Sequence, residues 1–346
     1  MKIIKLSDLQ KKDALSLLLA IASDEGRIDL HKIHQQTIQA IGHYILKIEV
    51  SISDISPTFS VASHISDKDI QVELLHLAGP LIFLENQHKE DRALALERLA
   101  KKWKHNDRLV KSIYKAAKGH KNAMFLCELR PTKAETGASA LYQSFFLVAS
   151  KLDFIHHKEL YERYTGYGQL PEGTFGRTLF EYYQDNEFSL PGTPNSEVND
   201  ILIRHDIHHV LSGYDTTPLG EIDVLAFDGA ISKVDFSAQI GAATAQFQIG
   251  YTIADPTINS WINQFNPDSV YHAYQRGMET KINYIDGKFD FTPYMKLPLS
   301  EVRKKFNISE EGMRVNSSKD KWCGPYGPPS KRKNPNLVKK PKHAIS

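Results

Sequence analysis

Two histidines and two carboxylates in the second half of the chain have the spacing of a metal site. His205, Asp206 and His209 lie in one stretch whose apolar positions predict a helix. On a helix, His209 lies about 40° from His205 and one turn further along, so both imidazoles can reach one ion. Glu221 follows twelve residues after His209, beyond a Ser-Gly turn, and an antiparallel helix would return it to the histidines. We therefore predict these four residues as ligands of a divalent metal.

The donor types bear on which metal binds. Neutral imidazoles with carboxylates suit zinc best; iron and manganese are alternatives, and magnesium is less natural because it prefers oxygen ligands. An open coordination position would let the ion polarise a substrate oxygen, with Glu221 and His205 as the predicted catalytic residues. His208 lies about 60° to the other side of His205, so the set His205, His208 and His209 stays open.

The adjacent His205 and Asp206 also permit a phosphohydrolase of the HD type. Such a site needs an upstream histidine, for which His156 or His157 is available, and a downstream aspartate. A separate motif, Leu170–Gly176, combines Pro and Gly in a tight turn before a predicted helix that Thr174 could cap. Free N–H groups at a helix start attract anions, so this turn is a candidate phosphate site or simply a loop and cap.

Helices are predicted throughout, and the expected fold class is all-α. Ser7 and Asp67 are placed as N-caps, Gly79-Pro80 ends a helix, and helical spacing continues over 87–117. Pro57 interrupts the β-branched stretch at 48–62, so we expect no strand there. The predicted organisation is a helical domain at 1–118, a linker at 119–137, a second helical domain at 138–310 that carries the candidate metal ligands, and a disordered, basic, Pro-rich tail at 311–346.

Composition narrows the function classes. The chain has 346 residues and a formal net charge of +2, with 43 Lys and Arg against 41 Asp and Glu. Eight basic residues and one acid lie in 319–346, so the body is acidic and we expect no nucleic-acid partner. Two distant cysteines predict a reducing compartment. No stretch is long and apolar enough to span a membrane, and no signal peptide is visible; we expect a cytoplasmic protein.

The turn Asp24-Glu25-Gly26, between two predicted helices, resembles the start of a TerB-like (tellurite-resistance) helical domain. The acid usual a few residues later in that family is absent here, where the chain reads Leu30-His31-Lys32. The alternative is a generic helical bundle in which Asp24 and Glu25 are only turn residues.

The later motifs together resemble the Coq4 family of ubiquinone biosynthesis. The matching positions are Leu170, Pro171, Gly173, Thr174, Gly176, His205, Asp206, His209, Gly220 and Glu221, and Pro298–Ile308 is similar to the closing segment of the family. The resemblance covers about 138–308. The chain differs from the family in its additional N-terminal domain, in His208 where an aromatic residue is usual, and in lacking a mitochondrial transit signature.

The resemblance implies a protein that binds a divalent metal and a polyprenylated quinone precursor. The implied chemistry is oxidative removal of the C1 carboxyl from a prenylated hydroxybenzoate. The alternative is a non-catalytic organiser that presents prenyl lipids to other quinone-biosynthesis enzymes, with peripheral contact on the inner face of the membrane. Leu141 and Phe145–Val148, or the small residues at 238–250, are candidates for an apolar lipid groove, although small residues also allow close helix packing.

Overall fold

The computed structural model describes residues 2–120, 158–193, 200–232, 236–251, 261–285, 288–317 and 319–332. Within these ranges every regular element is helical, apart from two isolated bridges, so the predicted all-α class is confirmed. The described α-helices are α1 (Asp8–Ala22), α2 (Lys32–Ala40), α3 (Lys68–Leu77), α4 (Lys89–Lys102), α5 (Arg108–Ala117), α8 (Lys158–Tyr167), α9 (Phe175–Asp185), α10 (Asp200–Ser212), α11 (Pro218–Ser232), α12 (Phe236–Gln248), α13 (Pro267–Glu279) and α14 (Leu299–Phe306). Short helical segments are η1 (Ile3–Lys5), η2 (Ile41–Leu46), η3 (Ile52–Asp54), η4 (Ser60–His64), η5 (Gly79–Phe83), η6 (Thr292–Tyr294) and η7 (Pro329–Lys331).

Local sequence chemistry sets the ends of the early helices. Ser7 forms a capping box with Gln10 at the start of α1, and the Asp67 carboxylate accepts from two backbone N–H groups at the start of α3. The predicted continuous helical segment at 87–117 is instead two helices. Asp107 caps α5 by accepting from the N–H of Val110 (3.0 Å), so the chain leaves the helix between α4 and α5.

The acidic turn after α1 is used inside the N-terminal fold. Asp24 pairs with Arg27 (3.1 Å) and with Arg98, and Glu25 accepts from the backbone N–H of Phe59 (3.2 Å). Both acids adopt positive φ and are thus committed to the turn geometry and its partners.

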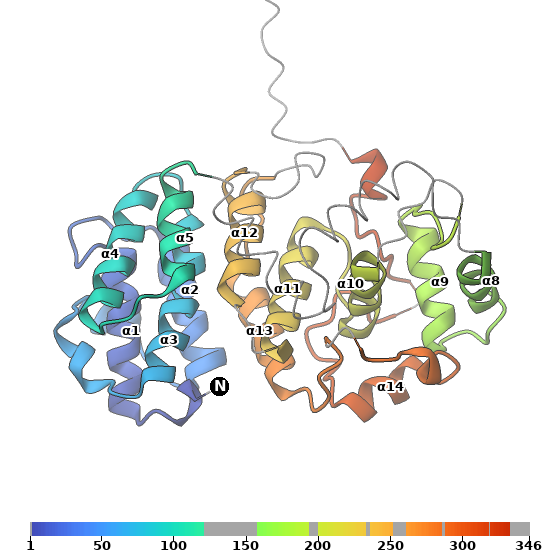
Figure 1. Cartoon of the computed structure of the whole chain (residues 1–346), viewed down its shortest axis with the longest axis horizontal. Helices are drawn as coiled ribbons and strands as arrows, with labels where there is room; N and C mark the ends of the chain where they lie inside the picture. Colours follow the sequence, from blue (N-terminus) through green and yellow to red (C-terminus); the bar gives the residue numbers. More distant parts are fainter. Residues whose placement is uncertain are drawn as a thin grey trace, which may run out of the picture.

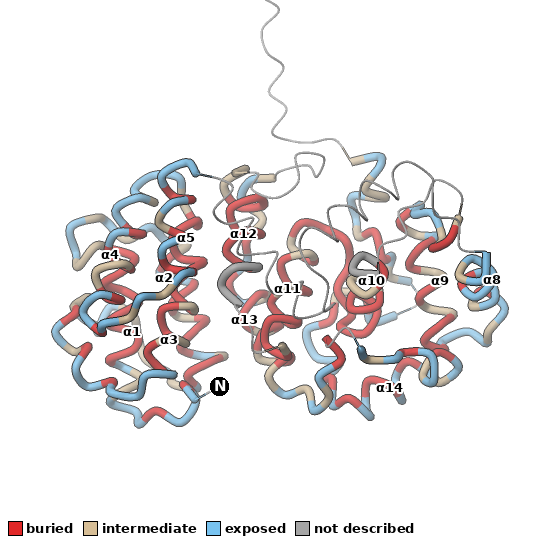
Figure 2. The backbone as a smooth tube through the Cα atoms, viewed as in Figure 1, coloured by how far each residue is buried: buried red, intermediate tan, exposed pale blue. Residues whose placement is uncertain are grey.

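Helices from both halves of the chain share one hydrophobic core. α12 packs against η5 and α3, and α13 packs against α2 and η2. The Tyr44 ring stacks on His272 with centroids 5.2 Å apart, and Gln248 Nε2 donates to the Leu84 carbonyl (3.3 Å). Figure 1 shows α12 and α13 between α1–α5 and the helices that carry the candidate site, and Figure 2 shows buried backbone on both sides of the contact. Ala242, Ala243 and Ala245 of α12 are buried within this core.

Two buried arginines hold the C-terminal end of α10. Arg276, on α13, donates to the carbonyl of Ser212 (2.9 Å), and Arg303, on α14, donates to those of Val210 (2.9 Å) and Leu211 (3.1 Å). These carbonyls have no partner within the helix, and cations are favourable at that end of the helix dipole. The arginines thereby fix the helix that presents His205 and His209.

The sequence predicted a disordered tail over 311–346, and the structure corrects where it starts. Trp322 and Cys323 are buried, and the Trp322 ring contacts that of Tyr182 (centroids 5.8 Å apart). Thr216 N–H donates to the Trp322 carbonyl (2.9 Å). One buried tryptophan thus anchors a segment whose average composition is polar and basic. Residues 311–317 and 319–332 belong to the fold, and 333–346 lie outside the described residues.

One buried histidine gives the N-terminal helices a pH dependence. His34 Nε2 donates to the Leu81 carbonyl (3.0 Å), and burial, aided by the Arg92 charge, lowers the pKa of His34 to about 3. An unfolded chain protonates this group near 6.5. Because the folded pKa is depressed, stability is complete above pH 6.5 and falls as pH drops from 6.5 towards 3.

We expect the free energy of unfolding to fall by about 2.5 kcal/mol between pH 7 and pH 4.5 through His34 alone. Urea unfolding of wild type and His34→Gln across this range would isolate the term, because all other titrating groups are common to both. A stability difference between the two proteins that stays constant with pH would contradict the prediction.

Candidate metal centre

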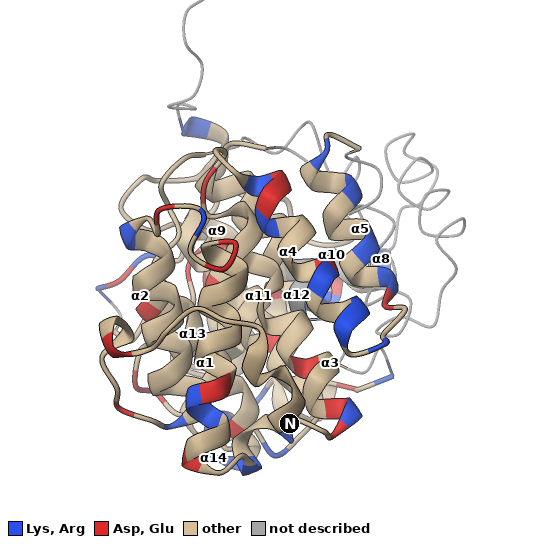
Figure 3. Cartoon of the chain, turned by 90° about the vertical axis from the view of Figure 1, so that its left-hand side faces the viewer, with Lys and Arg blue, Asp and Glu red and all other residues tan. Residues whose placement is uncertain are grey.

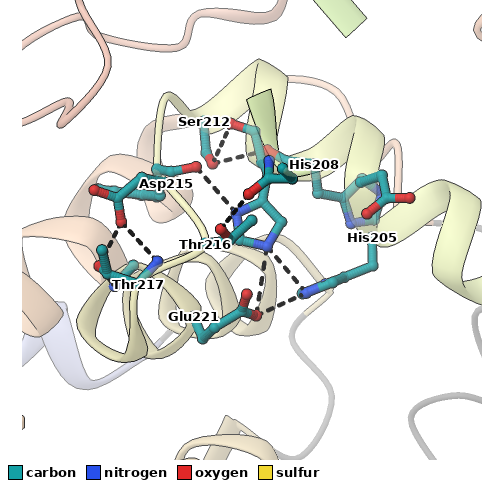
Figure 4. Close-up of polar contacts among 12 residues, drawn as sticks. His205, His208, Ser212, Asp215, Thr216, Thr217 and Glu221 are labelled. Atoms are coloured by element: carbon teal, nitrogen blue, oxygen red, sulfur yellow. Dashed lines mark hydrogen bonds and ion pairs between the residues drawn. The ribbon is translucent and has the colours of Figure 1, made fainter. Parts of the chain in front are cut away.

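Three side chains converge between α10 and α11. His205 Nε2 lies 3.1 Å from Glu221 Oε2 and 3.1 Å from His209 Nε2, and His209 Nε2 lies 3.4 Å from Glu221 Oε2. Figure 4 shows His205 and Glu221 pointing towards one another. A search of the described residues for three or more His, Cys, Asp or Glu side chains that could hold one metal ion finds His205, His209 and Glu221. The helical return predicted for Glu221 is therefore observed.

The turn at 213–217 brings Glu221 back to the histidines. Asp215 Oδ1 accepts from the N–H of Thr217 (3.0 Å), and Thr217 Oγ1 caps α11 by accepting from the N–H of Gly220 (3.1 Å). A Cβ at Gly220 would lie 2.0 Å from the Asp215 carbonyl oxygen, so only glycine fits there. The Gly-Glu pair is thus a structural requirement of the turn.

His209 is held in the tautomer that a metal ligand needs. Its Nδ1 lies 3.0 Å from the carbonyl oxygen of Tyr214, which can only accept, so Nδ1 carries the proton. In the neutral ring, Nε2 then presents its lone pair to His205 and Glu221. Metal-binding histidines commonly donate their second N–H in this way.

The cluster is built to hold positive charge. Burial by itself lowers the pKa of His205, but the hydrogen bond and charge of Glu221 outweigh it and raise that pKa to about 9. Burial raises the pKa of Glu221, while the charge of His209 and the hydrogen bond from His205 outweigh burial and hold it well below its usual range. A carboxylate that is forced to stay ionised between two imidazoles attracts a proton or a cation.

The ligand separations match a metal ion. An ion about 2.0–2.2 Å from each ligand atom holds those atoms about 2.9–3.5 Å apart, which covers all three observed distances. His209 is fully buried, whereas the side chains of His205 and Glu221 are 28% and 27% exposed. A metal ion held by these three side chains would therefore have one accessible side and an open coordination position.

Asp206, the fourth predicted ligand, lies outside this group. Its two carboxylate oxygens accept from the hydroxyls of Tyr182 (2.9 Å) and Tyr183 (2.6 Å) on α9. Burial raises the pKa of Asp206, and the two tyrosine hydroxyls partly oppose that shift. The structure brings together three of the four predicted ligands, because Asp206 faces α9 while the histidines face α11.

The Tyr182 hydroxyl should contribute to stability through Asp206. In Tyr182→Phe the ring still packs against His209, but Asp206 Oδ1 loses its donor in a buried setting. We expect a loss of about 1–3 kcal/mol in the free energy of unfolding, measured by urea denaturation. Tyr161→Phe, at an exposed position of α8, is the matched control and should be neutral. Equal stability of wild type and Tyr182→Phe would contradict the assigned hydrogen bond.

His208 also points away from the cluster. Its Nδ1 lies 2.8 Å from Asp228 Oδ2, and the ring packs against Tyr284 (centroids 5.1 Å apart). The structure therefore separates His208 from the alternative ligand set. An HD-type site would use Asp206 as a ligand, and the placement of its carboxylate gives that hypothesis no support. His156 and His157 lie outside the described residues.

Of the two alternatives for the start of α9, a phosphate site or a simple loop before the helix, the backbone contacts favour the loop. The N–H groups of Phe175 and Gly176 donate to the carbonyls of Leu297 (2.9 Å) and Met295 (2.8 Å). Thr174 occupies the N-cap position, but its hydroxyl donates to the Pro171 carbonyl (2.7 Å) and does not cap the helix. The turn joins α9 to the segment before α14 and leaves these two N–H groups no room for a phosphate.

The residues that support the cluster were not among those predicted from the sequence. Tyr182 stacks on His209 with centroids 5.7 Å apart, Tyr214 sets the tautomer, and Trp322 covers Tyr182 from the C-terminal segment. The one sequence feature that could have indicated this support is the adjacent pair of tyrosines at 182 and 183, which follows the Leu170–Gly176 motif. The proposed lipid-groove residues Leu141 and Phe145–Val148 lie outside the described residues.

No protein-family model matches the chain, and no curated protein matches it. Among solved structures, the chain is similar to a protein from Nostoc punctiforme PCC 73102 that is provisionally named a ubiquinone biosynthesis protein. The two are 18% identical over 70% of this chain and 99% of the other, with a TM-score of 0.32. Similarity of this degree identifies neither a family nor a ligand set.

Proposed function

We propose that this chain binds a divalent metal through His205, His209 and Glu221 and acts on a polyprenylated ring substrate in ubiquinone or related quinone biosynthesis. The observation that carries the metal site is the convergence of two Nε2 atoms and one carboxylate oxygen from separate helices. The pathway rests on the Coq4-like motif, in which these three residues occupy ligand positions.

Two imidazoles and one carboxylate suit zinc best, and iron(II) is the alternative that would suit oxygen chemistry. When bound, such an ion would supply Lewis acidity towards a carboxylate or ring oxygen of the substrate. His205 and Glu221 are the ligands with exposed surface, so the substrate is proposed to approach from their side. His209 lies behind them, covered by Tyr182.

The proposed reaction is oxidative decarboxylation at C1 of a prenylated hydroxybenzoate. The bond between C1 and the carboxyl group breaks and CO2 leaves, a hydroxyl derived from water forms at C1, and dioxygen accepts the two electrons to give hydrogen peroxide. His205 and Glu221 would orient the ring of the substrate, and the buried His209 would fix the position of the site on α10. The alternative, a non-catalytic organiser, uses the same three residues to brace α10 against α11. The two differ in turnover alone, so turnover must be measured directly.

The first experiment is metal analysis of the purified protein by mass spectrometry. The metal-loaded protein is then incubated in air with a polyprenylated hydroxybenzoate. Near-stoichiometric metal and a product in which hydroxyl replaces the C1 carboxyl would support the enzyme. Metal and substrate binding without product would support the organiser. If the protein held no metal after reconstitution and also bound no prenyl lipid, the proposed function would be refuted.

A further inference from the structure

One face of α5 exposes a row of basic side chains. Arg108, Lys111, Lys115 and Lys118 follow one another at helical spacing, and all four are exposed. We call these four residues the basic stripe. The opposite face of α5 is apolar and buried in the N-terminal core, so the helix cannot turn to hide the stripe. Figure 3 shows basic residues on α5 and on the connection from α4.

Little negative charge offsets this face. Lys101, Lys102 and Lys104, just before the stripe, are exposed too, and Asp107 is the only acid in 101–118. The Asp107 carboxylate is already engaged as the α5 cap and by His76 (3.2 Å). Lys101 pairs with Glu97 (3.2 Å), whereas no stripe residue forms an ion pair with another described residue. Lys111 Nζ donates to the Asn106 side chain, and Lys118 Nζ lies 4.5 Å from the centroid of the Tyr114 ring. Both partners are neutral, so the positive charges of the stripe are available to an external anion.

The C-terminal end of α5 leads to exposed apolar side chains. Trp261 and Tyr326 are in ring contact (centroids 5.7 Å apart); Tyr326 is 52% exposed and Ile262 is 45% exposed. We call Trp261, Ile262 and Tyr326 the aromatic cluster. Ile262 forms a backbone bridge with Ile249, the residue that follows α12. The Tyr251 hydroxyl, two residues further along the chain from Ile249, donates to the carbonyl of Ala116 in the last turn of α5 (3.3 Å).

The arrangement of elements agrees with these contacts. In Figure 1 the C-terminal ends of α5 and α12 and the short helix η7 lie along the same upper edge of the molecule. The aromatic cluster belongs to this edge through the bridge at α12 and through Tyr326, which precedes η7.

We propose that the basic stripe and the aromatic cluster form the contact surface for an anionic lipid bilayer. Clusters of Lys and Arg are attracted to anionic headgroups, and Trp and Tyr favour the membrane–water interface. No described helix is long and apolar enough to cross a bilayer, so the contact is peripheral. This inference goes beyond the proposed function and does not use the metal centre, although it would bring that centre to the phase where polyprenyl lipids reside.

The composition of the surface favours lipid over nucleic acid. Three of the four stripe residues are lysines, which act as point charges, whereas base recognition relies on the paired donors of arginine. Ile262 offers nothing to a phosphate backbone but gains from insertion among acyl chains. The two partners can be separated by direct comparison on the same protein.

The test is co-sedimentation of the full chain with vesicles of phosphatidylcholine alone and with about one third phosphatidylglycerol. We expect binding to the anionic vesicles only. The triple variant Arg108→Gln, Lys111→Gln, Lys115→Gln should bind about 100-fold more weakly, at about fivefold for each charge. The matched control Lys5→Gln, Lys12→Gln, Lys32→Gln removes three exposed charges elsewhere and should bind like wild type. No binding by wild type, or equal loss in both triple variants, would overturn the proposal.

Tryptophan emission tests the aromatic cluster. Trp103 and Trp322 are each 5% exposed, so Trp261 should dominate any change on binding. We expect the tryptophan emission to shift to shorter wavelength with anionic vesicles, and this shift to be lost in Trp261→Phe. Unchanged emission of the vesicle-bound protein would show that the aromatic cluster is not part of the contact surface. Tighter binding to a short DNA duplex than to the vesicles would overturn the lipid assignment. Metal content of the stripe variant should equal that of wild type, which separates this test from that of the proposed function.

Discussion

His209→Ala is expected to lower metal affinity by at least about 100-fold, the upper range for losing even an indirect support of a metal ligand. His209 is the fully buried member of the cluster, and the Tyr214 carbonyl holds its Nδ1–H so that Nε2 faces His205 and Glu221. Alanine removes one of the three candidate ligand atoms, and no other described His, Cys, Asp or Glu side chain belongs to the group. Metal content after purification and competition with a chelator would measure the effect.

Asp206→Asn is the informative companion variant. The sequence pattern includes Asp206 among four ligands, whereas the structure directs its carboxylate to Tyr182 and Tyr183. We expect Asp206→Asn to retain its metal and to lose stability, and His43→Ala, at an exposed position, to change neither. Metal loss in Asp206→Asn equal to that in His209→Ala would show that Asp206 is a ligand. Full metal content in His209→Ala would refute the centre.

Gly220→Ala should damage both the fold and the site. A Cβ there would lie 2.0 Å from the carbonyl oxygen of Asp215 and 2.4 Å from Asp215 Oδ1. Neither contact can be relieved without opening the turn at 213–217. The carbonyl belongs to the backbone, and the carboxylate accepts a hydrogen bond from the N–H of Thr217. We expect a loss of about 3 kcal/mol or more in the free energy of unfolding, together with loss of metal as Glu221 shifts. Urea denaturation and metal analysis would measure the two effects.

Gly166→Ala is the matched control for this substitution. Gly166 lies inside α8, and no atom lies within 4 Å of a Cβ built there. Alanine should therefore be neutral or stabilise by up to about 1 kcal/mol, since glycine is unfavourable within helices. Similar destabilisation by both variants would mean that the contact with Asp215 is not the cause.

Interactions between residues close in the sequence made the helices and part of the candidate site predictable. N-caps at Ser7 and Asp67 and the helical period of the apolar positions depend on neighbours within one or two turns. The pairing of His205 with His209 follows from the same period, since residues four apart share a helix face. The all-α class and the core of the candidate site were predictable for that reason.

Only the tertiary structure decided which neighbouring residues join the site. A helix of this period leaves Asp206 within reach of the histidine face or of the adjacent one, and the tyrosines of α9 select the adjacent one. The same holds for His208, which Asp228 draws towards another part of α11.

Contacts from distant parts of the chain decided the rest. The carbonyls at the end of α10 are held by Arg276 and Arg303, and Trp322 covers Tyr182 from a segment whose composition predicts disorder. Single buried residues control these features, and a composition averaged over a segment does not register them. The local pattern therefore determined His205, His209 and the return of Glu221, and the nearby Tyr214 carbonyl sets the tautomer of His209. Packing over longer sequence distances determined that Asp206 faces the tyrosines of α9 and that Trp322 covers Tyr182.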